Sequence, residues 1–381
     1  MALNRCMARF LCIAFLIGAA TLSAQILPDI AQAQEFDRQG KYAEGAQFWR
    51  KATEQNPQDV GALASLGVDL SRTGKYPEAA SVYRRALAID SRLPGIRVNL
   101  GLAEFKQGHF KEAIPPLETA LQENPGNTQI RVLLGMSSYA VGQYPAAIQY
   151  LEPIVAAEPH NAELRLVLAQ SCLWANQYER AFSEFKSLLR DNPNSPAVHL
   201  LTAEALDGLD REGEAIIELQ ALVKAAPKEP GAHFALGYVY WKQHQYPEAA
   251  AAFKAELAND PDHPQANGYL GDIYVRNRKF DEAMPLVRKA LKFEPQLRIA
   301  HFDLAVLYEN EKRYDDAIAE FRKAAKLDPT RADAYYRMAR IYQSLGRTKE
   351  AQAEYAMVNK LHREKADDLL RKVSGGPPAL K

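Results

Sequence analysis

The sequence has little cysteine, no excess of charge of one sign and no apolar run long enough for an ordinary membrane span. Only three of its 381 residues are cysteine, and two of these, Cys6 and Cys12, lie near the start. The 47 Lys and Arg residues are balanced by 47 Asp and Glu. Because nucleic-acid binding uses an excess of positive charge to neutralise phosphates, the balance argues against a nucleic-acid partner.

The first 24 residues have the pattern of a secretory signal peptide. Arg5 and Arg9 precede an apolar run from Phe10 to Ala20, and small residues follow it. A membrane-spanning helix needs about 20 apolar residues, so this shorter run indicates cleavage after Ala24 rather than a retained anchor. We expect an exported protein, periplasmic rather than extracellular, with no membrane span in its mature chain.

After such cleavage the sequence retains one cysteine, Cys172. An internal disulfide would be impossible, so packing must stabilise the fold. We expect Cys172 to be a small buried packing residue rather than a reactive thiol.

The sequence contains a repeat of 34 residues that runs without insertion. Alanines recur twelve residues after a small residue in each unit, and prolines recur near the end of most units. The small residues are Gly67, Gly101, Gly135, Ala169, Ala203, Gly237, Gly271, Ala305 and Ala339. Each unit has apolar residues at the spacing of one helical face, then a turn, then a second helical pattern. Counting from Val60, the small residues at positions 8 and 20 should let the two helices approach closely.

This pattern resembles the tetratricopeptide repeat (TPR). In residues 230–263 the resemblance is carried by Leu236, Gly237, Tyr240, Tyr246, Ala249, Phe253 and Pro261. It implies an all-α protein, an α-solenoid in which stacked helix-turn-helix repeats form a right-handed superhelix. We expect a degenerate N-terminal capping repeat at residues 25–59 and nine repeats at 60–365. The end of a C-terminal capping helix and a loose tail should occupy 366–381.

No motif of an enzyme site interrupts these repeats. The sequence has no glycine-rich phosphate loop, His-Glu-x-x-His, paired-cysteine motif or Gly-x-Ser-x-Gly. His199, His233 and His301 recur at position 4, but adjacent repeats place equivalent helices roughly 10 Å apart, too far for a shared zinc. We expect these side chains to cover the helix interface with their polar ends in water. We therefore expect no catalytic activity, no cofactor and no metal.

The resemblance also implies a concave groove lined by the first helix of each repeat. The candidate binding residues are Leu102, Phe105, Met136, Tyr139, Glu204, Asp207, Phe234, Tyr238, Trp241, Asp272, Phe302, Tyr336 and Arg340. Much of this groove should be apolar and aromatic, and exposed apolar patches usually mark interaction sites. The alternative is that tight winding makes these side chains part of the core.

Residues 234–253 contain six aromatic side chains that divide between two faces of the helix pair. Tyr240, Tyr246 and Phe253 occupy packing positions and should be core. Phe234, Tyr238 and Trp241 are spaced along the other face. We expect them to form a binding patch, and the neighbouring Glu204, Asp207 and Asp272 to favour a basic residue in the ligand.

The sequence thus predicts a non-catalytic exported scaffold for protein–protein interaction. Its groove should bind a peptide or helical segment that is apolar or amphipathic. The family's carboxylate clamp should be absent, because position 5 is apolar or glycine in all nine repeats. The alternative is a carbohydrate-binding accessory of polysaccharide export or cell-envelope assembly, in which the rings stack on sugars.

Overall fold

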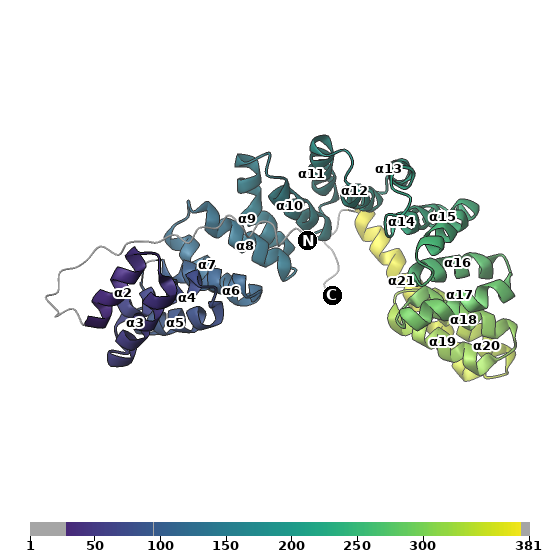
Figure 1. The fold of residues 1–381 in the computed structure, drawn as a ribbon. Coiled ribbons are helices and arrows are strands. Elements are labelled where there is room, and N and C mark those ends of the chain that lie inside the picture. The colour runs from purple at the N-terminus through teal and green to yellow at the C-terminus, as the bar shows by residue number, and fades with distance from the viewer. Residues whose placement is uncertain (1–27, 94, 375–381) are drawn as a thin grey trace. The chain divides into compact units, whose positions relative to one another are not determined.

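The computed structural model describes residues 28–93 and 95–374, with side chains described as far as residue 367. Every regular element in these residues is a helix, and successive helices pack in pairs (Figure 1). This confirms the predicted all-α fold of stacked helix pairs. The expected signal peptide at 1–24 lies outside the described residues, as does the tail beyond 374. No helix among the described residues has the length and apolar content to cross a membrane.

The chain divides into two compact units, of which the first ends at Asn194. Its helices are α2 (Pro28–Arg38), α3 (Tyr42–Gln55), α4 (Val60–Arg72), α5 (Tyr76–Ile89), α6 (Ile96–Lys106), α7 (Phe110–Glu123), α8 (Thr128–Ala140), α9 (Tyr144–Ala157), α10 (Ala162–Trp174) and α11 (Tyr178–Asp191). Several of them begin at a capping side chain. Asp59 accepts a hydrogen bond from the Ala62 backbone N at 2.9 Å, and Asn127 accepts one from Ile130 at 3.1 Å. Such caps satisfy donors that the first helical turn leaves unpaired.

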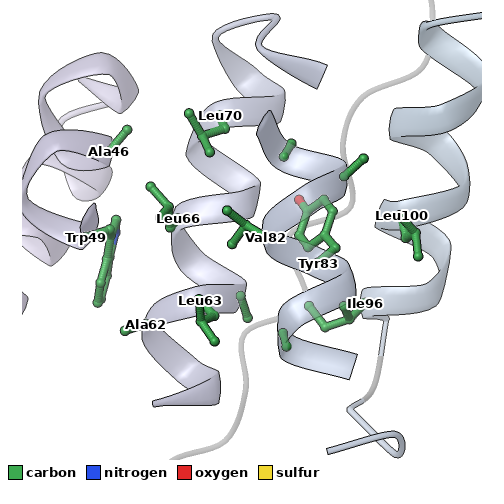
Figure 2. Close-up of a cluster of buried hydrophobic side chains, with 14 of the residues drawn as sticks. Ala46, Trp49, Ala62, Leu63, Leu66, Leu70, Val82, Tyr83, Ile96 and Leu100 are labelled. Atoms are coloured by element: carbon green, nitrogen blue, oxygen red, sulfur yellow. The ribbon is translucent and has the colours of Figure 1, made fainter. Parts of the chain in front are cut away.

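Side chains from the successive helices α2 to α6 form the N-terminal core of this unit, part of which Figure 2 shows. Trp49 comes from α3, Leu63 from α4, Tyr83 from α5 and Leu100 from α6, and all four are buried. No single helix pair supplies this core. Each repeat therefore depends on its neighbours for burial of its apolar face.

The second unit starts at Ser195. Its helices are α12 (Pro196–Gly208), α13 (Glu212–Ala225), α14 (Ala232–Lys242), α15 (Tyr246–Asn259), α16 (Pro264–Arg276), α17 (Phe280–Phe293), α18 (Arg298–Asn310), α19 (Tyr314–Leu327), α20 (Ala332–Ser344) and α21 (Thr348–Ser374). The last helix is the longest, at 27 residues. Within it, Val358 is buried.

The small residues at position 8 bring the two helices of a repeat together, as the sequence predicts. A Cβ atom on Gly67 would lie 2.3 Å from the Tyr83 ring, and one on Gly237 would lie 2.7 Å from the Phe253 ring. Since Tyr83 and Phe253 are almost fully buried, these rings have little room to move. Glycine at these positions is therefore a packing requirement.

The turn between the helices of a repeat uses a left-handed residue. Gly74 has a φ of 77°, which glycine adopts without steric cost. The same repeat position is held by non-glycine residues in five consecutive repeats, with φ between 55° and 60°: Asn176, Asp210, His244, Arg278 and Lys312. The turn geometry is thus retained where glycine is replaced, which puts polar and charged side chains at this end of the second unit's helix pairs.

Candidate functional site

Phe234, Tyr238 and Trp241 form one aromatic cluster together with Tyr269, which the sequence analysis did not select. Tyr238 stacks between Phe234 and Trp241, with ring centroids 6.2 and 6.3 Å away. Tyr269 of α16 meets Tyr238 and Trp241 edge-on at 5.4 and 4.9 Å. The Tyr269 ring also stacks on the fully buried Phe253, with centroids 5.9 Å apart, so it lies on the core side of the cluster. Burial raises the pKa of its hydroxyl to about 12. We call these four residues the aromatic cluster.

The rings of α14 in this cluster are half-buried, so they are neither full core residues nor a fully exposed patch. Phe234 also lies 5.9 Å from Phe253, a fully buried core residue. Tyr238 and Trp241 retain exposed surface. The fold therefore uses one side of these rings for packing and leaves another side accessible.

The other three aromatic residues of residues 234–253 differ in burial. Phe253 is fully buried, as predicted. Tyr240 and Tyr246 are half-buried and pack against the same core. Tyr240 also accepts a hydrogen bond at its hydroxyl from Gln220 Nε2 at 2.6 Å. These two rings thus lie at the edge of the core rather than inside it.

Trp241 is held in place by a buried carboxylate. Its Nε1 donates a hydrogen bond to Asp272 Oδ2 at 2.7 Å, and Arg276 Nε donates to the same oxygen at 2.6 Å. The Arg276 guanidinium also lies over the Trp241 and Tyr246 rings, 5.8 and 5.5 Å from their centroids. A planar guanidinium over an aromatic face is a favourable contact. The indole therefore has a fixed orientation.

A second buried carboxylate fixes the start of α14. Glu256 of α15 is 1% exposed, and its two oxygens accept hydrogen bonds from the backbone N atoms of Gly231 and Phe234, at 3.0 and 3.1 Å. A carboxylate at a helix N-terminus satisfies unpaired donors and is favoured by the helix dipole. This contact sets the position of the first ring of the aromatic cluster.

The three acidic residues near the aromatic cluster do not form the free negative surface that the sequence suggests. Asp272 is 3% exposed and is bonded to Trp241 and Arg276. Asp207 Oδ1 accepts from Lys242 Nζ at 2.6 Å. Glu204 keeps an exposed surface, and partial desolvation of its carboxyl, followed by the Asp207 charge, raises its pKa. Two of the three acids on which the expectation of a basic ligand residue rests, Asp207 and Asp272, are therefore already paired. The spacing of the sequence cannot show such pairing.

A cleft of about 610 Å³ lies on α16 and α18, next to the aromatic cluster. Asp272 and Arg276 line the cleft and also contact Trp241 of the cluster, and the cleft continues through Phe302 and Val306. Charged residues also line the cleft: Arg278, Asp303, Glu309, Lys312 and Arg337. We call it the α16–α18 cleft. The sequence predicted Asp272 and Phe302 on this surface, but it did not predict the basic residues of the cleft.

The other two candidates of the second unit lie on α20. Tyr336 is 46% exposed and meets Tyr355 edge-on at 6.2 Å. Arg340 is exposed. Neither lines the α16–α18 cleft, so the structure does not join them to the aromatic cluster.

The candidates of the first unit are less accessible than expected. Phe105 and Met136 are 6% and 4% exposed, and Leu102 is half-buried. Tyr139 stacks on Trp174, with centroids 5.4 Å apart, and donates a hydrogen bond to Gln170 Oε1 at 2.8 Å. Phe105 and Met136 are therefore core residues, which is the alternative that tight winding predicts.

Trp174 is the most accessible ring of this unit that sequence reasoning missed. It is 40% exposed, and Tyr144 also contacts it at 5.2 Å. Trp174 is position 13 of its repeat, one residue beyond position 12, which holds the candidates Phe105, Tyr139 and Trp241 in other repeats. Including position 13 among the positions expected to line the groove would have selected it.

The position-4 side chains make specific hydrogen bonds instead of simply covering an edge. His301 is 7% exposed, and its Nε2 lies 2.9 Å from the Pro295 carbonyl oxygen. Its Nδ1 lies 2.6 Å from Glu320 Oε2. Arg165 and His233 contact the corresponding proline carbonyls at 2.8 and 3.1 Å. In these repeats the position-4 residue therefore connects the first helix to the loop before it. The spacing of the sequence alone could not reveal the carbonyl acceptor.

Cys172 is fully buried, as predicted for a packing residue. Burial raises the pKa of its thiol to about 11. Within the described residues, no group of three or more His, Cys, Asp or Glu side chains is arranged to hold a metal ion.

The chain belongs to the tetratricopeptide repeat family. Two family models with that description match it, one at residues 30–94 and 234–298, the other at 104–170, 138–181, 173–236 and 308–372. These matches span most of the sequence. Proteins of this family are generally non-catalytic scaffolds for protein–protein interaction, and no curated protein sequence matches this chain.

Several solved structures are similar to this chain at low identity. The C-terminal part of a TPR repeat-containing protein from Cytophaga hutchinsonii is 22% identical, covers 63% of this chain and 98% of its own, and has a TM-score of 0.47. The APC/C hetero-tetramer Cut9–Hcn1 is 11% identical, with coverage of 87% and 86% and a TM-score of 0.46. MamA from Desulfovibrio magneticus RS-1 is 23% identical, with coverage of 45% and 97% and a TM-score of 0.39.

Proposed function

We propose that this protein is a non-catalytic scaffold that binds a segment of another protein on its aromatic cluster. The observation that carries the proposal is the half-exposed stack of Phe234, Tyr238 and Trp241, held rigid by Asp272 and Glu256. Rigid aromatic anchors provide large contact area at low entropic cost, and such residues dominate protein interfaces. The ligand segment is apolar or amphipathic, so that its own side chains can pack on these rings.

Substitution of the accessible rings tests this proposal. Tyr238→Ala and Trp241→Ala should each weaken binding of a protein partner by about 2 kcal/mol, the usual loss for a hot-spot ring. Proteins recovered by pull-down from the native host with the unchanged chain should be lost with both variants. Ile217→Ala is the matched control, because Ile217 is 68% exposed on α13, a second helix of a repeat. If all partners survive both ring substitutions in folded variants, the proposal is wrong.

Trp241→Phe separates binding from fold support. It keeps an aromatic ring but removes the Nε1 donor that Asp272 accepts. We expect Trp241→Phe to reduce stability while retaining part of the binding. Circular dichroism and thermal unfolding of each variant show whether a loss of binding reflects a loss of fold.

A carbohydrate ligand is the second candidate, and the exposed Trp174 ring favours it. Trp174 stacks on Tyr139 at an interplanar angle of 27° and leaves its other surface accessible. Sugar rings could stack there in an accessory of polysaccharide export or cell-envelope assembly. Titration with oligosaccharides should then change tryptophan fluorescence, and Trp174→Phe should remove the response. A response to peptides alone would favour the first proposal.

Export of the protein is part of the proposal and rests on the sequence of residues 1–24. We propose a periplasmic location, with an extracellular one as the alternative. Mass spectrometry of the N-terminus of protein isolated from its host tests this. A mature chain that begins at Gln25 supports export, and an intact N-terminus contradicts it.

A further inference from the structure

The α16–α18 cleft continues directly from the aromatic cluster. Asp272 and Arg276 line the cleft, and both also contact Trp241. A ligand segment whose apolar side chain packs on Trp241 would therefore bring its neighbouring residues to the cleft. The charges of the cleft decide which residues those can be.

Two basic residues of the cleft are already neutralised by acids within it. Arg276 Nε bonds to Asp272 Oδ2 at 2.6 Å, and Arg337 Nη1 lies 3.2 Å from Glu309 Oε2. A basic group in the ligand would have to compete with these arginines for both carboxylates. The paired acids are thus poor partners for a ligand cation.

Two further basic residues of the cleft have no acidic partner. Arg278 and Lys312 are exposed, and neither forms an ion pair with any residue that the structure describes. Both are the left-handed residues of their turns, with φ of 56° and 60°. They therefore lie at equivalent ends of α16 and α18, on the same side of the cleft.

Asp303 does not offset this positive charge. It is 1% exposed, and its Oδ2 has no hydrogen-bond partner in the described part of the chain. Burial, followed by the nearby Asp272 carboxylate, raises the pKa of Asp303 well above its usual range, which favours the uncharged acid. The cleft thus carries the positive charges of Arg278 and Lys312, and the buried Asp303 does not balance them.

We propose that the α16–α18 cleft binds an acidic side chain of the same protein segment whose apolar residue packs on the aromatic cluster. The proposal rests on the proposed function and adds the charge of the ligand. Arg278 and Lys312 would attract an Asp or Glu carboxylate at the mouth of the cleft. Complementary charge at the edge of an interface selects among ligands and speeds their association. The ligand class is therefore a segment with an apolar anchor and a nearby acid.

A random library of 12-residue peptides, displayed on phage and selected on the full chain, is the probe for this test. Selected peptides should contain an aromatic or large aliphatic residue with Asp or Glu enriched close to it. One selected peptide is then synthesised with a fluorophore, together with its counterpart in which the acid is replaced by the amide. The amide peptide should bind about fivefold more weakly at low salt, and added salt should reduce the difference.

The chain offers a neutral variant that preserves its turns. Arg278→Gly/Lys312→Gly introduces the residue that Gly74, Gly108, Gly142 and Gly346 provide at the same repeat position. It should weaken the acidic peptide about fivefold and leave the amide peptide unchanged. Asn176→Gly/Asp210→Gly is the matched control, because it makes the same backbone change at turns outside the cleft. The control should bind both peptides as the unchanged chain does.

The outcomes separate this inference from the proposed function. Apolar peptides without acidic enrichment, or an acidic peptide unaffected by Arg278→Gly/Lys312→Gly, would overturn the inference and leave the scaffold proposal standing. Enrichment of Lys or Arg would also overturn it. Failure to select any peptide whose binding depends on Tyr238, with binding of oligosaccharides instead, would overturn both.

Discussion

At the scale of single residues, the close approach of two helices depends on the absence of one methyl group. Gly67 lies against the ring of Tyr83, which is 1% exposed. The sequence predicts this contact from the 34-residue recurrence of small residues alone, because only a small side chain allows such an approach. Position 8 thus provides a direct test of the packing.

Gly67→Ala should destabilise the protein by about 1–3 kcal/mol, since its Cβ would overlap the Tyr83 ring and force the two helices apart. Gly213→Ala is the control, because a Cβ there meets nothing within 4 Å, and alanine is favoured over glycine in a helix. Chemical denaturation should therefore show opposite signs for the two variants. Equal effects would contradict the packing account.

A second residue-scale feature is a pair of carboxyl groups between α2 and α4, of which Asp69 is buried and Asp37 half-buried. A Cβ on Gly45 would lie 2.5 Å from both Asp37 Oδ1 and Asp69 Oδ2, so the two groups share one small space. Trp49 Nε1 donates to the other Asp37 oxygen at 2.9 Å. Burial, and then the contact with Asp37, raise the pKa of Asp69 to about 8, against a smaller opposing effect of Arg72.

Stability of the N-terminal repeats should fall as pH rises from about 4 to about 8. Across this interval the native state retains the Asp69 proton, whereas the unfolded chain, with an ordinary pKa of about 4, has lost it. The free energy of unfolding therefore decreases with pH. Hydrogen exchange of α3 and α4 at pH 5 and pH 8 measures the effect, and Asp69→Asn should flatten it. An equally steep pH dependence in Asp69→Asn would show that another group is responsible.

At the scale of the helix, position 4 connects the first helix to the preceding loop in several repeats. Arg165, Asn267 and His301 differ in charge and size, yet each places a nitrogen on a proline carbonyl six residues earlier. The common feature is a hydrogen-bond donor that can reach this carbonyl. This explains why the position tolerates different polar residues.

His301 can be replaced in two ways that separate its two contacts. His301→Asn should keep the bond to Pro295, as Asn267 bonds to Pro261 at 3.1 Å, and lose only Glu320. His301→Leu should lose both and leave polar groups unpaired, at a cost of about 1–3 kcal/mol. Denaturant unfolding should therefore rank Asn between wild type and Leu. If Leu is the more stable of the two variants, the position-4 contact does not support the fold.

The helices could be predicted from the sequence to a greater extent than the binding surface. Fixed spacing reveals Gly67 and its equivalents because one packing constraint recurs in every repeat. Tyr269, Arg278 and Lys312 follow no such recurrence, and their importance arises from neighbouring helices that only the fold brings together. The pairing of Asp207 with Lys242 and of Asp272 with Trp241 is likewise absent from the spacing, so the sequence could not show that two of the three acids already have partners.

At the scale of the whole molecule, the repeats provide a framework on which a few positions differ. Position 8 and the buried alanines are nearly uniform along the chain, whereas the aromatic cluster and the α16–α18 cleft occur in the second unit, on α14, α16 and α18. Stability is thus shared among neighbouring repeats, and specificity is local. Substitutions in the cluster should alter binding more than folding.

The most direct test is photo-crosslinking in the native host from benzoylphenylalanine placed at position 238. Tyr238 is half-buried in the aromatic cluster, and its replacement keeps the hydrogen bond between Trp241 and Asp272. The same group at Ile217 on α13 serves as the control. We expect a protein crosslinked at 238 but not at 217, and loss of that crosslink with Trp241→Ala. The same products from both positions, or none from 238, would contradict the claim that the aromatic cluster binds a protein segment.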